Sequence, residues 1–259
     1  MSRFATRLSK YLLITTALLL LAQLAVPAQA QTQITSCGTV IDAPGNYVLA
    51  NDLNCPGIDG IDITASNVTL ELNNHQITGY RMSYAGLAVF KNNTVLSHVT
   101  INGPGTITNF MHGVFFYSQT YGSLSRITCT GNYLGFLISG PGSEYNLIEN
   151  NTANLNQHYG FQITSPGGIY GYNQANQNGD AGFLLAADDA QANALGSNTA
   201  DQNTYGIVTL PGAAHNLISG NSAHGNSAYD LSELNYHLFD CTNIWQRDNF
   251  GTRNKECIH

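Results

Sequence analysis

Charged residues are scarce in this sequence, and basic residues are scarcer than acidic ones. Lysine and arginine together number nine among 259 residues, against 16 aspartates and glutamates. Such an acidic surface repels nucleic acid and anionic lipid, so we expect neither as a partner. Methionine is also rare, at three residues, which argues against the soft-ligand sites that hold copper(I).

The sequence has only one long apolar run, which lies at the N-terminus. A basic segment ends at Lys10, an uncharged apolar run of 16 residues covers 11–26, and a small-x-small pattern follows at Ala28 to Ala30. Sixteen residues is short for a membrane span, and the three features together are typical of a secretory signal peptide. We therefore predict a signal peptide at 1–30 and a secreted or periplasmic mature domain at 31–259. This domain should have no integral membrane segment; an uncleaved anchor is the alternative.

All five cysteines lie in the predicted mature domain, and export to an oxidising compartment permits disulfides. Cys37 and Cys55 lie near its start, whereas Cys241 and Cys257 lie near its end. We predict a disulfide within each pair, so that each bond stabilises one end of the domain. Cys129 is left over. It takes an alanine position in the repeat described next, and we expect a buried free thiol rather than a metal ligand or reactive group.

Internal repeats fill most of the mature domain. A glycine followed by an apolar residue recurs at steps of 22 to 27 residues, at Gly86, Gly113, Gly135, Gly160, Gly182 and Gly206, and Asp230-Leu231 holds the same place once more. The motif Asn-x-Ala-x-x-Asn keeps phase with these glycines at 151–156, 173–178, 198–203 and 221–226. The segments between turn residues are three to five residues long, which predicts strands rather than helices. Strands that recur at this period stack as a solenoid.

The repeat predicts an all-β fold, a single-stranded right-handed parallel β-helix of about seven coils with disulfide-stapled end caps at about 34–56 and 232–259. Leucine-rich repeats would need more leucine and a helical segment, and left-handed hexapeptide helices a stricter, shorter period. Asparagine tolerates left-handed backbone at turns, and stacked amides can hydrogen-bond from coil to coil. The alanine of the motif should point inward at a tight corner. Trp245 is expected to cover the last coil.

Both ends of the domain and the repeat itself resemble a known superfamily. The segments 37–55 and 241–257 are similar to the entry and closing segments of exported proteins in the pectin-lyase-like superfamily of right-handed parallel β-helices. The repeat resembles the units of NosD-type periplasmic proteins and of uncharacterised exported members. The resemblance implies polysaccharide as a partner but no single activity, because the superfamily contains lyases, hydrolases, epimerases and non-enzymes.

The catalytic motifs of these enzymes are not found in the sequence. The adjacent acids Asp188-Asp189 lack the glycine context and the downstream basic elements of polygalacturonases. The calcium cluster with a basic residue of pectate lyases and the Asp-Pro-His-Asp motif of alginate epimerases are also missing. Asp188, Asp189 and Asp201 remain as a candidate metal site, with calcium as the candidate ion. The alternative is a solvated corner loop.

The repeat contains one constellation of its own. His158 and Asp180 each lie two residues before a repeat glycine, so they should stack about 5 Å apart, the spacing of neighbouring strands. A carboxylate at that distance can orient an imidazole, which makes His158 the candidate catalytic base and Asp180 its partner. Tyr133, Tyr159 and Tyr205 lie beside them and suit sugar binding. The alternative is a surface pair with tyrosines that cover the corner.

Our leading hypothesis is an exported β-helix that binds extracellular or cell-envelope polysaccharide along one lateral face. If it is an enzyme, the resemblance implies a lyase or hydrolase acting on a polyuronide or similar acidic glycan. A non-catalytic structural or adhesive solenoid is the alternative, and a periplasmic copper-handling protein like NosD is a third. The pattern leaves open whether the column formed by Phe115, Leu137, Leu184 and Val208 points inward or forms an outer apolar stripe. It leaves the oligomeric state open as well.

Overall fold

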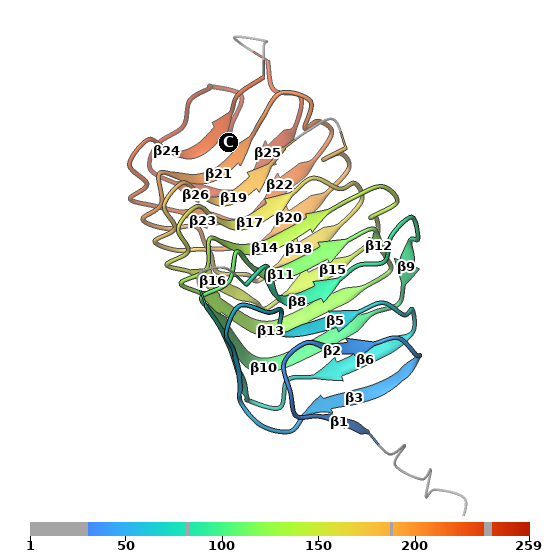
Figure 1. Cartoon of the computed structure of the whole chain (residues 1–259). Coiled ribbons are helices and arrows are strands. Elements are labelled where there is room, and N and C mark those ends of the chain that lie inside the picture. The colour runs from blue at the N-terminus through green and yellow to red at the C-terminus, as the bar shows by residue number, and fades with distance from the viewer. Residues whose placement is uncertain (1–30, 81–82, 187–188, 236–239) are drawn as a thin grey trace, which may run out of the picture. The chain divides into compact units, whose positions relative to one another are not determined.

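The computed structural model describes residues 31–80, 83–186, 189–235 and 240–259, and all regular elements in these ranges are β-strands (Figure 1). The predicted signal peptide at 1–30 lies outside the described residues. Within the described ranges, no helix is long and apolar enough to cross a membrane.

Most strands belong to two parallel sheets. Sheet 1 has nine strands, in the order β2 (Thr39–Ile41), β5 (Ile61–Ile63), β8 (Ala85–Val89), β11 (His112–Tyr117), β14 (Leu134–Ser139), β17 (Tyr159–Ile163), β19 (Ala181–Leu185), β21 (Tyr205–Thr209) and β24 (Tyr229–Glu233). Sheet 2 has 13 strands. Its main path is β1 (Thr32–Ile34), β3 (Gly45–Leu49), β6 (Val68–Glu71), β10 (Thr100–Thr108), β13 (Ser123–Thr130), β15 (Leu147–Glu149), β18 (Ile169–Gly171), β20 (Ala194–Gly196), β22 (Leu217–Ser219) and β25 (Ile244–Gln246).

The remaining strands are short and extend this arrangement. They are β4 (Leu53–Cys55), β7 (Gln76–Gly79) and β16 (Thr152–Asn154) in sheet 2, and the pairs β9 (Leu96–Ser97) with β12 (Gln119–Thr120) and β23 (Ser222–Ala223) with β26 (Asn249–Phe250). Every pair of named strands is parallel, from β1 with β3 to β22 with β25. Consecutive strands of one sheet are therefore successive turns of a parallel β-helix, as the repeat predicted.

Each repeat motif corresponds to one turn. Six repeat glycines and Asp230 lie one by one on the seven strands from β8 to β24, and the residues after them pair in register. Two further strands of sheet 1, β2 and β5, precede this series. The segment 34–56 supplies β2, β3 and β4, which pair with β5, β6 and β7, so it forms a turn of the same kind.

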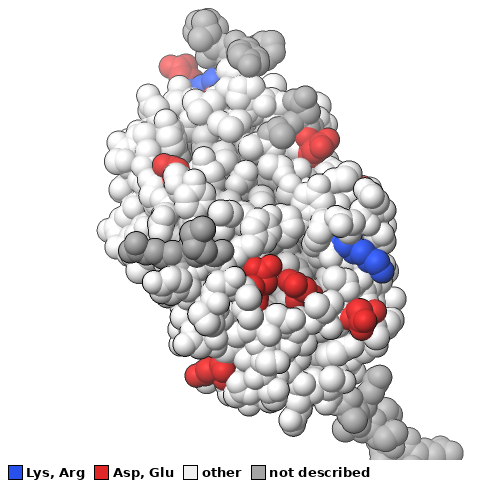
Figure 2. All heavy atoms as spheres, viewed as in Figure 1, with Lys and Arg blue, Asp and Glu red and all other residues white. Residues whose placement is uncertain are grey.

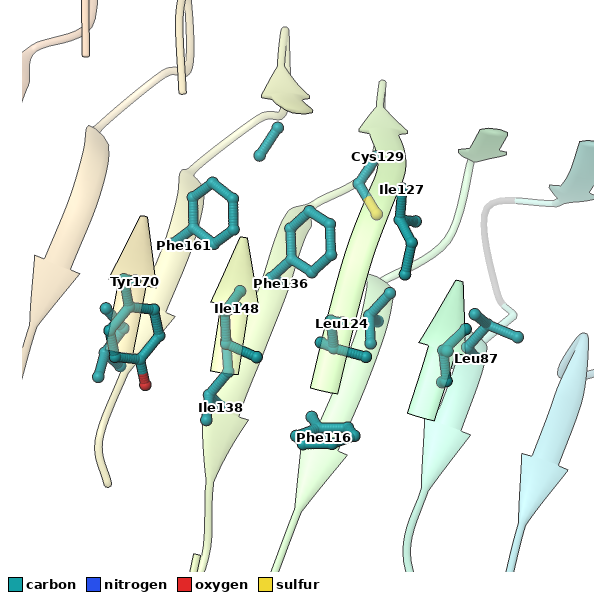
Figure 3. Close-up of a cluster of buried hydrophobic side chains, with 14 of the residues drawn as sticks. Leu87, Phe116, Leu124, Ile127, Cys129, Phe136, Ile138, Ile148, Phe161 and Tyr170 are labelled. Carbon is teal, nitrogen blue, oxygen red and sulfur yellow. The ribbon is translucent and has the colours of Figure 1, made fainter. Parts of the chain in front are cut away.

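The core is built from columns of side chains stacked at the strand spacing. The rings of Phe136, Phe161 and Phe183 lie parallel, with centroids 4.7 and 4.8 Å apart (Figure 3 shows the first two). Cys129 is a buried free thiol and pairs in register with Ala153, which confirms its alanine-like position. The repeat alanines, Ala153, Ala175, Ala200 and Ala223, are fully buried.

The repeat asparagines form buried hydrogen-bonded ladders that run along the solenoid. Asn178 is representative. Its Oδ1 accepts hydrogen bonds from the backbone N–H and from Nδ2 of Asn156, each at 3.0 Å. Its Nδ2 donates to the Ala153 carbonyl at 2.9 Å and to Oδ1 of Asn203 at 3.1 Å. The amide therefore satisfies backbone groups that the corner leaves without a strand partner.

One part of the sequence reasoning on asparagine was wrong. The ladder asparagines do not have the left-handed backbone; in many turns the residue just before them does, as at Leu155, Gln177 and Gln202, with φ near +58°. These residues are partly or fully exposed, whereas the asparagines point inward and are buried. Asparagine is required here for its amide hydrogen bonds and not for its tolerance of left-handed φ.

Both predicted disulfides are formed, between Cys37 and Cys55 and between Cys241 and Cys257. They lie near the two ends of the β-helix. Trp245 lies on the final strand of the main path of sheet 2 and is buried, and its Nε1 donates a hydrogen bond to Oε2 of Glu233 at 2.7 Å. It belongs to the main hydrophobic core, as expected for a residue that covers the last coil.

Candidate functional site

The outer face of sheet 1 has a mostly apolar column, which Gln162 interrupts between Leu137 and Leu184. On β11, Val114 and Phe116 belong to the main core, so the intervening Phe115 points outward. Phe115 and Leu137 join one small outer cluster, and Leu184 and Val208 join another. Phe115, Leu184 and Val208 are only 9%, 5% and 3% exposed, because neighbouring outer side chains cover them. The column is therefore an outer stripe, and other side chains on the same face of sheet 1 largely cover it from solvent.

The N-terminal edge of this face collects most of the predicted site residues. From β8 to β24, each strand of sheet 1 begins at the residue before its repeat glycine, or before Asp230 in β24, and the strands all run in the same direction. Residues one or two positions before each glycine therefore line up along one edge. From β5 to β24 this edge includes Asp59, Tyr84, His112, Met111, Tyr133, His158, Tyr159, Asp180, Tyr205 and Tyr229.

His158 and Asp180 are in contact at the middle of this edge. Nδ1 of His158 lies 2.5 Å from Oδ2 of Asp180, and the two side chains are 37% and 47% exposed. The Tyr133 ring lies against the imidazole, with centroids 4.1 Å apart. A carboxylate on Nδ1 favours the proton on that nitrogen, which leaves the lone pair of a neutral ring on Nε2. The pair is half open to solvent and could exchange a proton with a bound molecule.

Tyr159 and Tyr205 lie next to this pair, on β17 and β21. Each pairs in register with Ala181, so the small alanine separates the two phenols along the edge. Burial raises the pKa of Tyr159, and the charge of Asp180 adds to the effect, so this phenol stays protonated and can donate a hydrogen bond. Both tyrosines remain partly exposed.

Two of the three predicted metal residues, Asp189 and Asp201, lie among the described residues. Asp188 lies outside the described residues. Oδ1 of Asp201 accepts the backbone N–H of His224 at 2.8 Å. Asp189 is exposed in the loop after β19, and no group of three His, Cys, Asp or Glu side chains among the described residues could hold a metal ion. Calcium binding by the three aspartates stays a prediction.

A pocket that the sequence reasoning missed lies at the N-terminal end of sheet 1. It has a volume of about 390 Å³, within the range of small-molecule sites. Its lining comes from the outer face of β2, β5, β8 and β11 and from the residues just before and after β5 and β8. It consists of Val40, Asp59, Asp62, Thr64, Tyr84, Ala88, Phe90 and Phe115. Two carboxylates and three aromatic rings therefore face one cavity.

Backbone hydrogen bonds fix Asp59, whereas Asp62 has no partner among the described residues. Oδ1 of Asp59 accepts the N–H groups of Tyr84 and Ala85, each at 3.0 Å. Asp62 is half-buried on β5, and its carboxylate forms no hydrogen bond or ion pair with any residue that the structure describes. Burial raises the pKa of Asp62, and the negative charge of Asp59 raises it further. The carboxylate is thus held in an environment that disfavours its own charge.

A buried histidine lies beside this pocket. His112 is 7% exposed, and its ring centroid lies 4.8 Å from that of Tyr84, which lines the cavity. Nδ1 of His112 is buried without a hydrogen-bond partner among the described residues. Burial lowers the pKa of this imidazole. A polar atom left unpaired in such a place costs free energy, so it calls for a functional or structural reason.

A second groove adjoins the pocket through Phe90. It has a volume of about 590 Å³ and is lined by residues 90–95, 117–118 and 141–142, which include Lys91 and Tyr117. The rings of Phe90 and Tyr117 meet edge to face at 5.6 Å, and Phe90 also contacts Phe115. The aromatic surface is therefore continuous from the pocket into the groove.

The sequence did contain a signal for the pocket. Gly60-Ile61 is a glycine-apolar pair 26 residues before Gly86, which is within the range of the repeat steps. Recognition of this extra unit would have placed Asp62 in the same outer column as Phe115, two residues after the glycine.

Comparisons with known proteins agree with the fold. Residues 37–195 match a family model described as "Right handed beta helix region". Among solved structures, the A-module of Azotobacter vinelandii mannuronan C-5 epimerase AlgE6 superposes with a TM-score of 0.57 at 14% identity, covering 86% of this chain and 69% of that one. The AlgE4 A-module of the same organism gives 0.56 at 15% identity, covering 86% and 71%. No curated protein matches the chain in sequence.

Proposed function

This chain belongs to the right-handed beta helix family, and from that premise we propose that it is an exported protein that binds extracellular or cell-envelope polysaccharide along the outer face of sheet 1. The solved structures that superpose on it include enzymes named for mannuronan, a polysaccharide. Two disulfides near the ends of the β-helix suit an oxidising compartment outside the cytoplasm.

The main support for this proposal is the row of aromatic rings and hydrogen-bonding groups along the N-terminal edge of sheet 1. Tyrosines stand at this edge from Tyr84 before β8 to Tyr229 on β24, with His158 and Asp180 between them. Six strand spacings separate these ends, which is about 29 Å at 4.8 Å per strand. A tyrosine offers an apolar face to a sugar ring and a hydroxyl to its hydroxyls. A hollow of about 560 Å³ beside Tyr133 adds room for a bound chain.

Within this proposal, His158 is the group that would take a proton from a bound glycan. Asp180 holds Nδ1 at 2.5 Å and would stabilise the imidazolium that forms. The neighbouring phenol of Tyr159 stays protonated and could donate a hydrogen bond to a developing negative charge. The catalytic half of the proposal therefore depends on three side chains at one place on the edge.

Binding is tested by the loss of one exposed ring. We expect Tyr133→Ala to weaken glycan binding about tenfold, which corresponds to roughly 1.4 kcal/mol, in titration calorimetry against a panel of neutral, acidic and amine-bearing oligosaccharides. Tyr172→Ala is the matched control, because Tyr172 is 66% exposed at the end of β18 in sheet 2. Equal losses in both variants, or none in either, would contradict binding along sheet 1.

Catalysis is tested separately. The protein is incubated with polyuronides and other glycans, with and without calcium, and turnover is followed by ultraviolet absorbance and reducing ends. We expect His158→Ala to abolish turnover while binding is retained, and Asp180→Asn to reduce it strongly. If the wild-type protein turns over no glycan, the catalytic half is removed and a non-catalytic structural or adhesive solenoid remains.

A further inference from the structure

The described lining of the pocket between β2 and β11 has two acidic side chains and no basic side chain. The Asp62 carboxylate is half-buried and has no partner among the described residues, and the Asp59 carboxylate lines the same cavity. Buried charges in proteins are normally paired. None of the eight described residues that line the pocket is a lysine, arginine or histidine. An occupant that carries positive charge would supply the pairing that the described lining residues do not provide.

The described surface around the pocket is also rich in negative charge. In the view of Figure 2, two acidic side chains adjoin over the region of β5 and β8, and the described basic side chains in view, coloured blue, lie near the margins of the molecule. The sequence as a whole has a formal charge of −7. An anionic sugar such as a uronate would meet repulsion here, whereas a cation would be attracted.

The walls of the pocket favour an organic cation over a bare ion. Tyr84, Phe90 and Phe115 line the cavity, and aromatic faces attract ammonium groups as well as the apolar face of a sugar ring. A calcium ion takes six to eight oxygen ligands. The pocket offers two carboxylates, one of which already accepts two backbone N–H groups, and no metal-binding group of three side chains exists among the described residues.

We propose that this pocket binds the protonated amine of an amino sugar, with Asp62 as its ion-pair partner and the aromatic wall against the sugar ring. This inference rests on the proposed polysaccharide binding and names the glycan class at the N-terminal end of sheet 1: a chain that contains hexosamine residues with free amino groups. Asp59, held by the N–H groups of Tyr84 and Ala85, adds a second negative charge. The cavity volume suits a single small unit of such a chain.

The test compares oligosaccharides of equal length by titration calorimetry at pH 6, where the amines of glucosamine oligomers are largely protonated. The probes are glucosamine oligomers, N-acetylglucosamine oligomers, galacturonate oligomers and calcium chloride alone. We expect the wild-type protein to bind glucosamine oligomers at least tenfold more tightly than their N-acetylated counterparts, with an affinity that falls as salt is added. Galacturonate oligomers should bind least well.

Two variants connect this preference to the pocket. Asp62→Asn keeps the shape of the side chain, and we expect it to reduce the affinity for glucosamine oligomers about tenfold without changing that for N-acetylated ones. Its melting temperature should be equal to or above that of the wild type, because the substitution removes a half-buried charge that burial and Asp59 both disfavour. Glu256→Gln makes the same change of net charge at an exposed position and should alter neither affinity.

Each outcome separates the two proposals. Glycan binding with no amine preference, or an amine preference that Asp62→Asn leaves intact, overturns the inference while polysaccharide binding stands. Calcium binding that Asp62→Asn abolishes also overturns it, because the pocket is then a metal site. A wild-type protein that binds none of the glycans in either panel overturns the proposed function, and the inference falls with it.

Discussion

Replacement of Asn178 by alanine tests whether the buried amide ladders hold the coils together. The side chain makes four hydrogen bonds, two accepted from Asn156 and one donated to each of Ala153 and Asn203. Alanine removes all four. The Nδ2 of Asn156 still reaches the Cys129 carbonyl, so the main losses fall on the backbone N–H of Asn156 and the carbonyl of Ala153.

The expected magnitude follows from these two backbone groups. Each buried polar group that loses its partner costs about 1–3 kcal/mol, so Asn178→Ala should lower the free energy of unfolding by about 2–6 kcal/mol. Typical domains have about 5–15 kcal/mol in all, so this is a large fraction. Asn178→Asp should cost less at acidic pH than at neutral pH, because a neutral carboxyl is easier to bury in this column than a charged one.

The assay is urea-induced unfolding followed by circular dichroism. Gln177→Ala is the control, because Gln177 is the next residue, is more accessible and makes an exposed hydrogen bond to Gln202. We expect this control to change the unfolding free energy by less than about 0.5 kcal/mol, as is usual for surface substitutions. If Asn178→Ala costs no more than Gln177→Ala, the ladder does not hold the coils together and the reasoning fails.

Three further predictions concern buried groups. Burial raises the pKa of Asp248 from 3.8 to about 6, so the folded state binds this proton more tightly than the unfolded state, and the stability that the bound proton confers is lost as pH rises from about 4 through about 6. Asp248→Asn should therefore make the melting temperature depend less on pH between pH 4 and 7. An unchanged dependence on pH would contradict this. Burial also raises the pKa of Cys129, so a thiol-specific reagent should react with it only after unfolding, and fast reaction in the native state would refute the buried position. A Cβ on Gly160 would lie 2.7 Å from the carbonyl oxygen of Gly182. Gly160→Ala should therefore lower the unfolding free energy by about 1–3 kcal/mol. If urea unfolding shows no decrease in this free energy, neighbouring coils can move apart to make room for the methyl group.

The parallel β-helix could be predicted from the sequence because residues that recur at the same point of each repeat are stacked in one column of the structure. A residue type that every turn requires must recur at the length of the turn, as Gly160 and Gly182 do. Ala153 and Ala175 are fully buried for the same reason, and Cys129 could be placed by analogy with them. The disulfides followed from the position of the cysteines near the ends of the chain.

The direction of the outer column could not be predicted from a period of two. Gly113 and Val114 are consecutive, yet both face the core: a Cβ on Gly113 would lie 2.6 Å from the Cys129 sulfur, and Val114 is fully buried. The in-out alternation is interrupted at the glycine, so alternation counted from the glycine itself gives Phe115 the wrong side. Only the packing of the turn decides that Phe115 points outward.

The pocket depended on features that a repeat search does not see. Asp59 lies in a turn and is held by backbone N–H groups of the next coil, which no side-chain motif indicates. Asp62 replaces the apolar residue that occupies the same column at Ala88 and Phe115. A departure from the repeat at one coil is easily taken for a defect in the pattern, whereas here it marks the position of the candidate site.

The amide ladders have a direction, and this limits how the scaffold can be lengthened. Asn221 donates from its backbone N–H and its Nδ2 to Oδ1 of Asp248. The Asp248 side chain, once ionised, has no hydrogen-bond donor for a further coil. A unit of 22 to 27 residues duplicated inside the array would have an amide donor facing it on one side and an amide acceptor on the other. A unit grafted beyond Asp248 would bring one oxygen against another, so engineering of longer versions should insert coils internally or first restore an asparagine at this position.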